Sequence, residues 1–153
     1  VAPQFRKKGI SYHHRAGDPT LTVFADREKV QQIVVNLLAN AMKFTSPGGT
    51  VGLEWTVEDE ILLVQIRDTG GGIPEDKLEL IFEPFVQLRA PGSTPSGGTG
   101  LGLPISRDLA RAMTGDVRVT SALGIGSVFT LMMCAGSPRP AVCWTAPLTP
   151  KER

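Results

Sequence analysis

The spacing of apolar residues changes from a helical to a strand period in the first half of the chain. Over residues 30–42 apolar residues recur every three or four positions, which predicts an amphipathic helix that begins near Asp26 and ends near Phe44. Residues 51–57 and 62–66 then alternate apolar and polar side chains, which predicts two strands with one covered face. Such a chain is expected to place its helix on one face of an antiparallel sheet.

The remaining segments predict more strands and helices. We expect strands around residues 10–12 and 21–24, a short helix over 75–82, a helix over 101–113, and final strands over 116–121 and 127–133. Residues 86–99 are rich in Pro, Gly, Ser and Thr without periodicity, which is typical of a functional lid or an inserted loop. The order predicts an α+β fold, a two-layer α/β sandwich with helices packed on one face of a mixed, mostly antiparallel sheet.

The composition excludes several classes of protein. The 153 residues include 16 Lys+Arg and 15 Asp+Glu, a formal net charge of +1, which argues against a nucleic acid partner. No apolar run approaches the ~20 residues that cross a bilayer, so we expect no direct membrane contact. The two cysteines are too few for a disulfide framework, which favours a cytoplasmic location. After Gly136 the chain becomes Pro-rich, which predicts a domain over 1–136 and a linker or disordered tail over 137–153.

The first predicted helix carries a polar sector opposite its apolar stripe. At 100° per residue, Asn36, Asn40 and Lys43 fall on one side of the helix, away from Leu37 and Ala41. Amide oxygens can bind a hard cation, and an ammonium group can neutralise phosphate. A solvated helix face is the alternative interpretation.

Asp68 is followed directly by three glycines. It has the strand parity of the apolar set 62–66, so its carboxylate is expected at the edge of the core, where it needs a donor such as the exocyclic amine of a purine. The glycines 70–72 would let a flat ring approach the backbone. The alternative is an ordinary turn that Asp68 caps.

A second glycine cluster, residues 98–103, opens a predicted helix. Backbone N–H groups at a helix N-terminus, accessible beside glycine, form an anion site. The spacing matches neither a dinucleotide fingerprint nor a Walker A loop. A flexible hinge would explain the same glycines.

Taken in order, these segments resemble the ATP-binding catalytic domain of sensor histidine kinases, within the GHKL group. Residues 36–45 (NLLANAMKFT) resemble the N box, 68–74 (DTGGGIP) the G1 box, 81–85 (IFEPF) the F box, 98–103 (GTGLGL) the G2 box and 124–127 (GIGS) the third glycine box. The resemblance covers roughly residues 5–134. It implies the Bergerat-type sandwich with a flexible ATP lid.

The resemblance also implies roles for individual residues. Asn40 would hold Mg²⁺ through its side-chain oxygen, Lys43 would neutralise phosphate charge, and Asp68 would accept a hydrogen bond from the adenine amino group. ATP-hydrolysing relatives carry Glu where this chain has Asn36, and an amide cannot act as a general base at neutral pH. The expected catalytic residues are therefore Asn36, Asn40 and Lys43, in a domain that transfers phosphoryl groups and hydrolyses ATP slowly.

The other ATP contacts that the resemblance implies are Gly70, Gly72, Ile73, Phe82, Phe85, Arg89, Gly98, Thr99, Gly100, Leu101, Gly102, Leu103 and Ser127. Many relatives carry Lys or Arg in the lid, whereas no charged residue lies between Ala90 and Leu103 here. Arg89 is thus the one local cation expected to reach the phosphates.

The resemblance implies that Mg²⁺-ATP donates its γ-phosphoryl group to a histidine, which then serves a downstream response regulator. His13 and His14 lack the helical surroundings of such an acceptor, so we expect it on a separate dimerisation domain of the parent protein, which could be membrane-anchored. The isolated domain is expected to be monomeric. Two alternatives stay open, a degenerate ATP-binding regulatory module and a serine kinase of the anti-sigma type.

Overall fold

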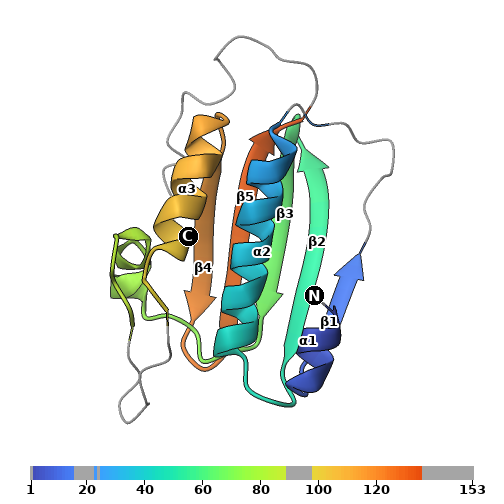
Figure 1. Cartoon of the computed structure of the whole chain (residues 1–153), viewed down its shortest axis with the longest axis vertical. Coiled ribbons are helices and arrows are strands. Elements are labelled where there is room, and N and C mark those ends of the chain that lie inside the picture. The colour runs from blue at the N-terminus through green and yellow to red at the C-terminus, as the bar shows by residue number, and fades with distance from the viewer. Residues whose placement is uncertain (1, 16–22, 24, 89–97, 136–153) are drawn as a thin grey trace, which may run out of the picture.

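The computed structural model describes residues 2–15, 23, 25–88 and 98–135, which form two layers (Figure 1). The elements are α1 (Ala2–Lys7), β1 (Ser11–Arg15), α2 (Arg27–Phe44), β2 (Thr50–Glu58), β3 (Ile61–Asp68), the 3₁₀ turns η1 (Glu75–Lys77) and η2 (Leu80–Phe82), α3 (Gly102–Ala112), β4 (Asp116–Ala122) and β5 (Gly126–Cys134). The strands form one sheet in the order β1-β2-β3-β5-β4. β1 pairs in parallel with β2 and the other pairs are antiparallel. Because α2 and α3 cover the same face, the predicted α+β sandwich is confirmed.

The long helix α2 has well-defined ends and one buried face. The Asp26 carboxylate caps its start by accepting hydrogen bonds from the backbone nitrogens of Glu28 (3.0 Å) and Lys29 (3.2 Å). The bond from the Lys29 backbone is the main reason why the pKa of Asp26 is lowered. At the other end the buried Thr45 hydroxyl donates to the Ala41 carbonyl at 2.7 Å. The buried residues of the helix are Ile33, Leu37, Leu38 and Ala41.

Strand β3 confirms the alternation predicted from the sequence. Leu62, Val64, Ile66 and Asp68 are buried on one face, so Asp68 lies at the edge of the core as expected. β2 follows the prediction less well, because Val57 near its end is 42% exposed. The register pairs β1 with residues 50–54 of β2, so among the residues that the structure describes this end of β2 has no neighbouring strand on that side.

Two segments differ from the prediction. Residues 2–7 form the helix α1, which no pattern indicates because Phe5 is its one buried residue. Residues 75–82 form two 3₁₀ turns instead of one α-helix, closed by the bonds from Lys77 N to Pro74 O and from Phe82 N to Glu79 O. A stretch this short gains little from helical cooperativity, which favours the tighter turns.

Some predictions lie outside the described residues. Of the strand expected over 21–24, Val23 is described and forms an isolated bridge with Ala135. Residues 89–97 of the predicted lid and the tail from residue 136 onward are not described, so the domain boundary near residue 136 stays a prediction. Within the described part of the chain, no helix has both the length and the apolar character that spanning a membrane requires.

Candidate functional site

Contacts bring the predicted motifs together at the end of the sheet where β3 ends and β5 begins. Asp68 at the end of β3 is the register partner of Ser127 in β5. The C-terminus of α2 lies over the same end, the lower one in Figure 1, and the N-terminus of α3 lies beside Asn36 in the middle of α2. Segments as far apart in sequence as the N box and the third glycine box therefore border one region.

The N box meets the G2 box through Asn36. Its amide nitrogen donates a hydrogen bond to the hydroxyl of Ser106, at 2.8 Å. A Cβ atom at Gly102 would lie 2.4 Å from the Asn36 amide oxygen, so the start of α3 approaches this side chain closely. Asn36 is thus half-buried between two helices.

The other two polar residues of the N box lie further along α2. Asn40 and Lys43 are both half-buried. The ammonium nitrogen of Lys43 lies 5.1 Å from the ring centroid of Phe44, a cation–π distance. Of the three polar residues, Asn40 and Lys43 are the nearer ones to the C-terminus of α2, where Phe44 lies close to Gly70 of the G1 box.

Asp68 is the buried carboxylate of the region. It is 6% exposed, and one oxygen accepts a hydrogen bond from the backbone nitrogen of Gly70 at 2.8 Å. Burial raises the pKa of Asp68, while hydrogen bonds from the backbones of Gly70 and Ser127 oppose that shift in part. A buried carboxylate of this kind favours a ligand that brings a donor.

The glycines after Asp68 fit tightly against backbone of the protein itself. A Cβ at Gly72, whose φ is +73°, would lie 2.1 Å from the Ala122 carbonyl oxygen, and one at Gly70 would lie 2.5 Å from the Phe44 carbonyl oxygen. Gly71 is exposed and a Cβ there would meet nothing within 4 Å. The fold thus requires Gly70 and Gly72 for packing, and their role beside a base remains a prediction.

The start of α3 has the features of an anion site. Its N-cap residue, Leu101, makes no side-chain capping bond, and no acidic residue lies in the first turn. Gly100 precedes it at φ +70°, and its carbonyl accepts a hydrogen bond from the nitrogen of Phe85 at 3.0 Å. Gly98 and Thr99 are exposed, Leu103 is half-buried, and Arg89 lies outside the described residues.

The two predicted F-box phenylalanines have different surroundings. Phe82 is buried, with the Arg107 guanidinium 4.3 Å from its ring centroid, whereas Phe85 is 74% exposed at φ +65°. Arg107 also bonds to Glu79 (2.9 Å) and Asp116 (3.2 Å). Arg107 thereby fixes the F-box segment against α3 and β4.

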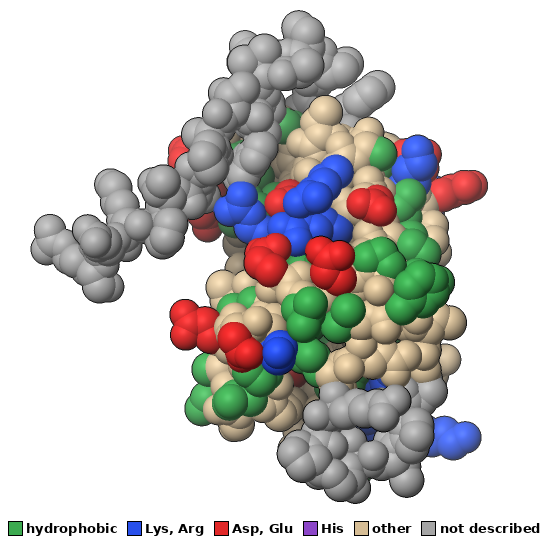
Figure 2. Space-filling model, turned by 90° about the vertical axis from the view of Figure 1, so that its left-hand side faces the viewer, with side chains coloured by type: hydrophobic (Ala, Val, Ile, Leu, Met, Phe, Trp, Pro, Cys, Tyr) green, Lys and Arg blue, Asp and Glu red, His purple; other side chains and the backbone are tan. Residues whose placement is uncertain are grey.

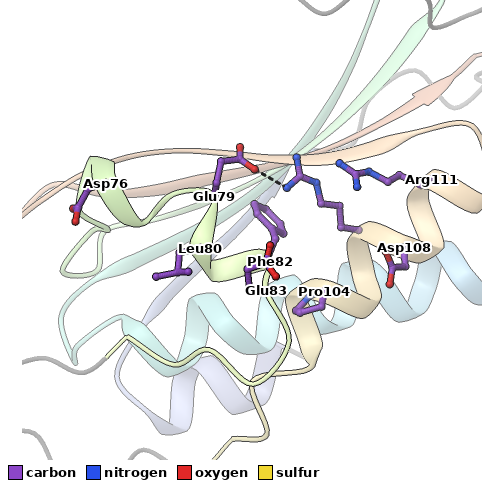
Figure 3. A pocket seen from close by; sticks show the side chains of 9 residues that line it. Asp76, Glu79, Leu80, Phe82, Glu83, Pro104, Asp108 and Arg111 are labelled. Carbon is purple, nitrogen blue, oxygen red and sulfur yellow. Dashed lines mark hydrogen bonds and ion pairs between the residues drawn. The ribbon is translucent and has the colours of Figure 1, made fainter.

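A hollow of about 390 Å³ lies on the outer side of α3 (Figure 3). Its α3 wall consists of Pro104, Arg107, Asp108 and Arg111, which share one helix face that does not include Ser106. Charged side chains of both signs gather on this side of the molecule, the face shown in Figure 2. Carboxylates from Asp76, Glu79, Glu83 and Asp108 line the hollow, and Phe82 is the one predicted ATP contact in it. These carboxylates would repel a triphosphate, so we place the candidate site at the end of β3 instead.

The oxygen atoms that this region offers as metal ligands suit a magnesium ion that is bound together with a nucleotide. Within the described residues, no group of three or more His, Cys, Asp or Glu side chains could hold a metal ion. Mg²⁺ usually takes one or two protein oxygens and fills its other positions with phosphate oxygens and water. The amide oxygen of Asn40 fits that habit.

Comparison with known proteins identifies the family. Residues 25–136 match the family described as histidine kinase-, DNA gyrase B-, and HSP90-like ATPase. The chain belongs to this family. A sensor-like histidine kinase of Rhizobium meliloti, itself uncharacterised, is 38% identical over 151 residues, which are 97% of this chain and 29% of that protein.

Solved structures of this ATPase family share the fold. Full-length ShkA in complex with AMPPNP superposes with a TM-score of 0.76 at 35% identity, over 91% of this chain and 28% of ShkA. The catalytic domain of the histidine kinase ThkA gives a TM-score of 0.75 at 28% identity, over 87% of this chain and 85% of that domain. The chain thus spans less than a third of the R. meliloti kinase and of ShkA, but most of the ThkA catalytic domain. The resemblance read from the motifs, to the catalytic domain of histidine kinases, is confirmed.

Three residues at these motifs are not predicted from the sequence. Ser106 and Arg107 are consecutive residues of α3, and their partners Asn36 and Glu79 lie 70 and 28 positions away in the sequence. Ser121 bonds to the backbone nitrogen of Ile73 and to the hydroxyl of Ser127. The hairpin around the GIGS motif places Ser121 opposite Ser127, so strand pairing could have indicated that position.

Proposed function

We propose that this domain binds Mg²⁺-ATP and donates the γ-phosphoryl group to a histidine on a separate dimerisation and phosphoacceptor domain of its parent protein, in two-component signalling. The observation that carries the proposal is that α2 contacts both other motifs. Asn36 bonds to Ser106 beside the start of α3, and the Phe44 carbonyl lies close to Gly70, two residues after Asp68. An amide oxygen in the N box suits a magnesium ion, the buried carboxylate suits the adenine amino group, and the uncapped helix N-terminus suits the triphosphate.

Each end of the nucleotide has a proposed partner in this chain. Asp68 accepts a hydrogen bond from the adenine amino group beside Gly70, Gly72 and Ile73. Asn40 would hold the Mg²⁺ ion, which neutralises phosphate charge when it is bound. Lys43 adds a second positive charge, and the backbone of residues 98–103 follows the triphosphate. Arg89 is the proposed cation of the lid.

In the proposed reaction the histidine nitrogen attacks the γ-phosphorus, an N–P bond forms, and the bond to the bridging β–γ oxygen breaks, so ADP leaves. Asn36 occupies the position at which a carboxylate could activate water. Its amide cannot take a proton and already donates to Ser106. The domain is therefore expected to hydrolyse ATP at below about 1 s⁻¹, the low end of typical enzyme turnover.

The proposal places the domain within a larger protein. We propose that it works as a monomeric unit in the cytoplasm, with no nucleic acid partner and no direct membrane contact. Residues 137–153 would form a linker or tail. A response regulator would receive the phosphoryl group from the histidine domain.

The test is to incubate the domain with γ-labelled ATP, Mg²⁺ and the histidine-bearing segment of the parent protein. Label on that segment that acid removes and alkali does not, as expected for phosphohistidine, supports the proposal. Nucleotide binding without any label would indicate a degenerate regulatory module, and acid-stable label on a serine would indicate a serine kinase. Either of these two results contradicts the proposal. The Asn40→Ala variant is the control, in which transfer is expected to be lost.

A further inference from the structure

A row of polar side chains crosses three strands on the helix-covered face of the sheet. Asp68 pairs with Ser127 across β3 and β5, and Ser127 pairs with Ser121 across β5 and β4. Directly opposed residues point to the same face, and on β3 that face carries the buried Ile66. Asp68 and Ser127 are each 6% exposed, so polar side chains occupy buried positions that the strand alternation would otherwise give to apolar residues.

The hydroxyl of Ser121 is fully used by three partners. It donates to the Gly126 carbonyl at 2.9 Å, and it accepts from the backbone nitrogen of Ile73 at 2.8 Å. Its oxygen also lies 2.9 Å from the hydroxyl oxygen of Ser127. A serine hydroxyl has one proton and two acceptor positions. Because the single proton goes to Gly126, Ser127 must be the donor to Ser121.

The hydrogen bonds of Ser121 determine whether the Ser127 hydroxyl can donate or accept toward a ligand. Its own proton points to Ser121, so toward any further partner the Ser127 oxygen can act only as an acceptor. Asp68 beside it is also an acceptor, and its donors are the backbone nitrogens of Gly70 and Ser127. Two neighbouring acceptors attract an amino group and disfavour a carbonyl oxygen at the same place.

We propose that Ser121 is a positioning residue that makes Ser127 an acceptor, and that the site thereby selects purine nucleotides with a 6-amino group over those with a 6-oxo group. The proposal rests on the proposed function, since it assigns the purine base to Asp68. Ser121 also holds the backbone of Ile73, directly after the glycines, and so places the loop that borders the same base.

The experiment measures dissociation constants for ATP and ITP, each with Mg²⁺, because the two differ in the 6-substituent and the attached ring proton. The wild-type domain is compared with Ser121→Ala, with Ser121→Thr, which keeps the hydroxyl, and with Thr120→Ala, an exposed neighbour on β4. We expect the preference for ATP over ITP to narrow about fivefold in Ser121→Ala, the equivalent of one ordinary hydrogen bond, and to persist in the other two variants.

A purely structural role for Ser121 would weaken ATP and ITP binding in proportion. An unchanged ATP-to-ITP ratio in Ser121→Ala would therefore overturn the proposal. If Ser121→Ala fails to fold by circular dichroism, Ser121→Cys gives the same test, because a thiol is a much weaker donor and acceptor at the same position.

Two further outcomes separate this proposal from the proposed function. Wild-type protein that binds ATP and ITP equally well overturns the role of Ser121 and leaves ATP binding intact. Wild-type protein that binds neither nucleotide contradicts the proposed function and this inference together.

Discussion

The amide of Asn36 on α2 donates a hydrogen bond across 2.8 Å to the hydroxyl of Ser106 on α3. Ser106 is 2% exposed, so the bond forms in a largely desolvated contact between the two helices. It connects the N-box helix with the helix that the G2 box opens, and it holds them with Gly102 directly against the Asn36 side chain. The relative placement of two predicted ATP-binding segments therefore depends on this pair.

Removing this bond is expected to lower stability. Asn36→Ala and Ser106→Ala should each reduce the free energy of unfolding by about 1–2 kcal/mol, because each leaves a shielded polar partner unpaired. Since both remove the same bond, the double variant should lose about 1 kcal/mol less than the sum. Urea denaturation of the four proteins measures this, and strictly additive losses would show that the bond contributes nothing.

The two neighbouring glycines of the G1 box are expected to respond differently to alanine. Gly72→Ala places a Cβ against the Ala122 carbonyl at a positive φ, so it should cost at least about 2 kcal/mol of stability. Gly71→Ala meets open space and is the matched control, with an expected change within about 0.5 kcal/mol. Thermal unfolding of both variants tests this, and equal effects would contradict the backbone approach at Gly72.

Phe85 stores backbone strain at the near end of the predicted lid. Its φ of +65° is costly for any residue with a Cβ, while its side chain is 74% exposed and contributes little burial. Phe85→Gly is therefore expected to be more stable than Phe85→Ala by about 1 kcal/mol, the reverse of the order in ordinary helical positions. Chemical denaturation that finds the alanine variant more stable would show that the strain is absent.

Asp68 is expected to make stability depend on pH in an unusual direction. Because burial raises its pKa in the folded state, the folded chain binds more protons than the unfolded chain between the ordinary Asp pKa and the raised one. The contribution of Asp68 to the free energy of unfolding is favourable below that pH interval, and it is lost as the pH rises through the raised pKa. Asp68→Asn cannot ionise and should lack this change.

The measurement for Asp68 is the free energy of unfolding of wild type and Asp68→Asn from neutral pH down to about 3.5, below the ordinary Asp pKa. On acidification the difference between the two proteins is expected to shift in favour of the wild type. A shift in the opposite direction would mean that hydrogen bonds to the carboxylate outweigh its burial.

Elements with a repeating local pattern could be predicted from the sequence. The stripe of α2 required nothing beyond the spacing of its apolar residues, and the alternation of β3 was sufficient to place Asp68 at the edge of the core. The start of α3 agrees with the helix that the glycine cluster 98–103 is expected to open. Within these elements, local chemistry and tertiary packing favour the same conformation.

Features that arise from tertiary contacts could not be predicted. The helix α1 buries only Phe5, so it leaves no repeat to detect. The bond from Asn36 to Ser106 joins residues 70 positions apart. The requirement for Gly72 comes from the Ala122 backbone, although the sequence suggested space for a base. In each case the cause is a neighbour that only the folded chain supplies.

The most direct test of the account is an equilibrium titration of the domain with AMPPNP, with and without Mg²⁺. For the wild type we expect saturable binding that Mg²⁺ strengthens. Asp68→Asn should weaken it about tenfold, the equivalent of one charge-assisted hydrogen bond, and Asn40→Ala should remove the Mg²⁺ effect. Asp76→Asn, in the hollow on the outer side of α3, is the control and should bind like the wild type. Unchanged binding in Asp68→Asn and Asn40→Ala, or loss of binding in Asp76→Asn, would contradict the account.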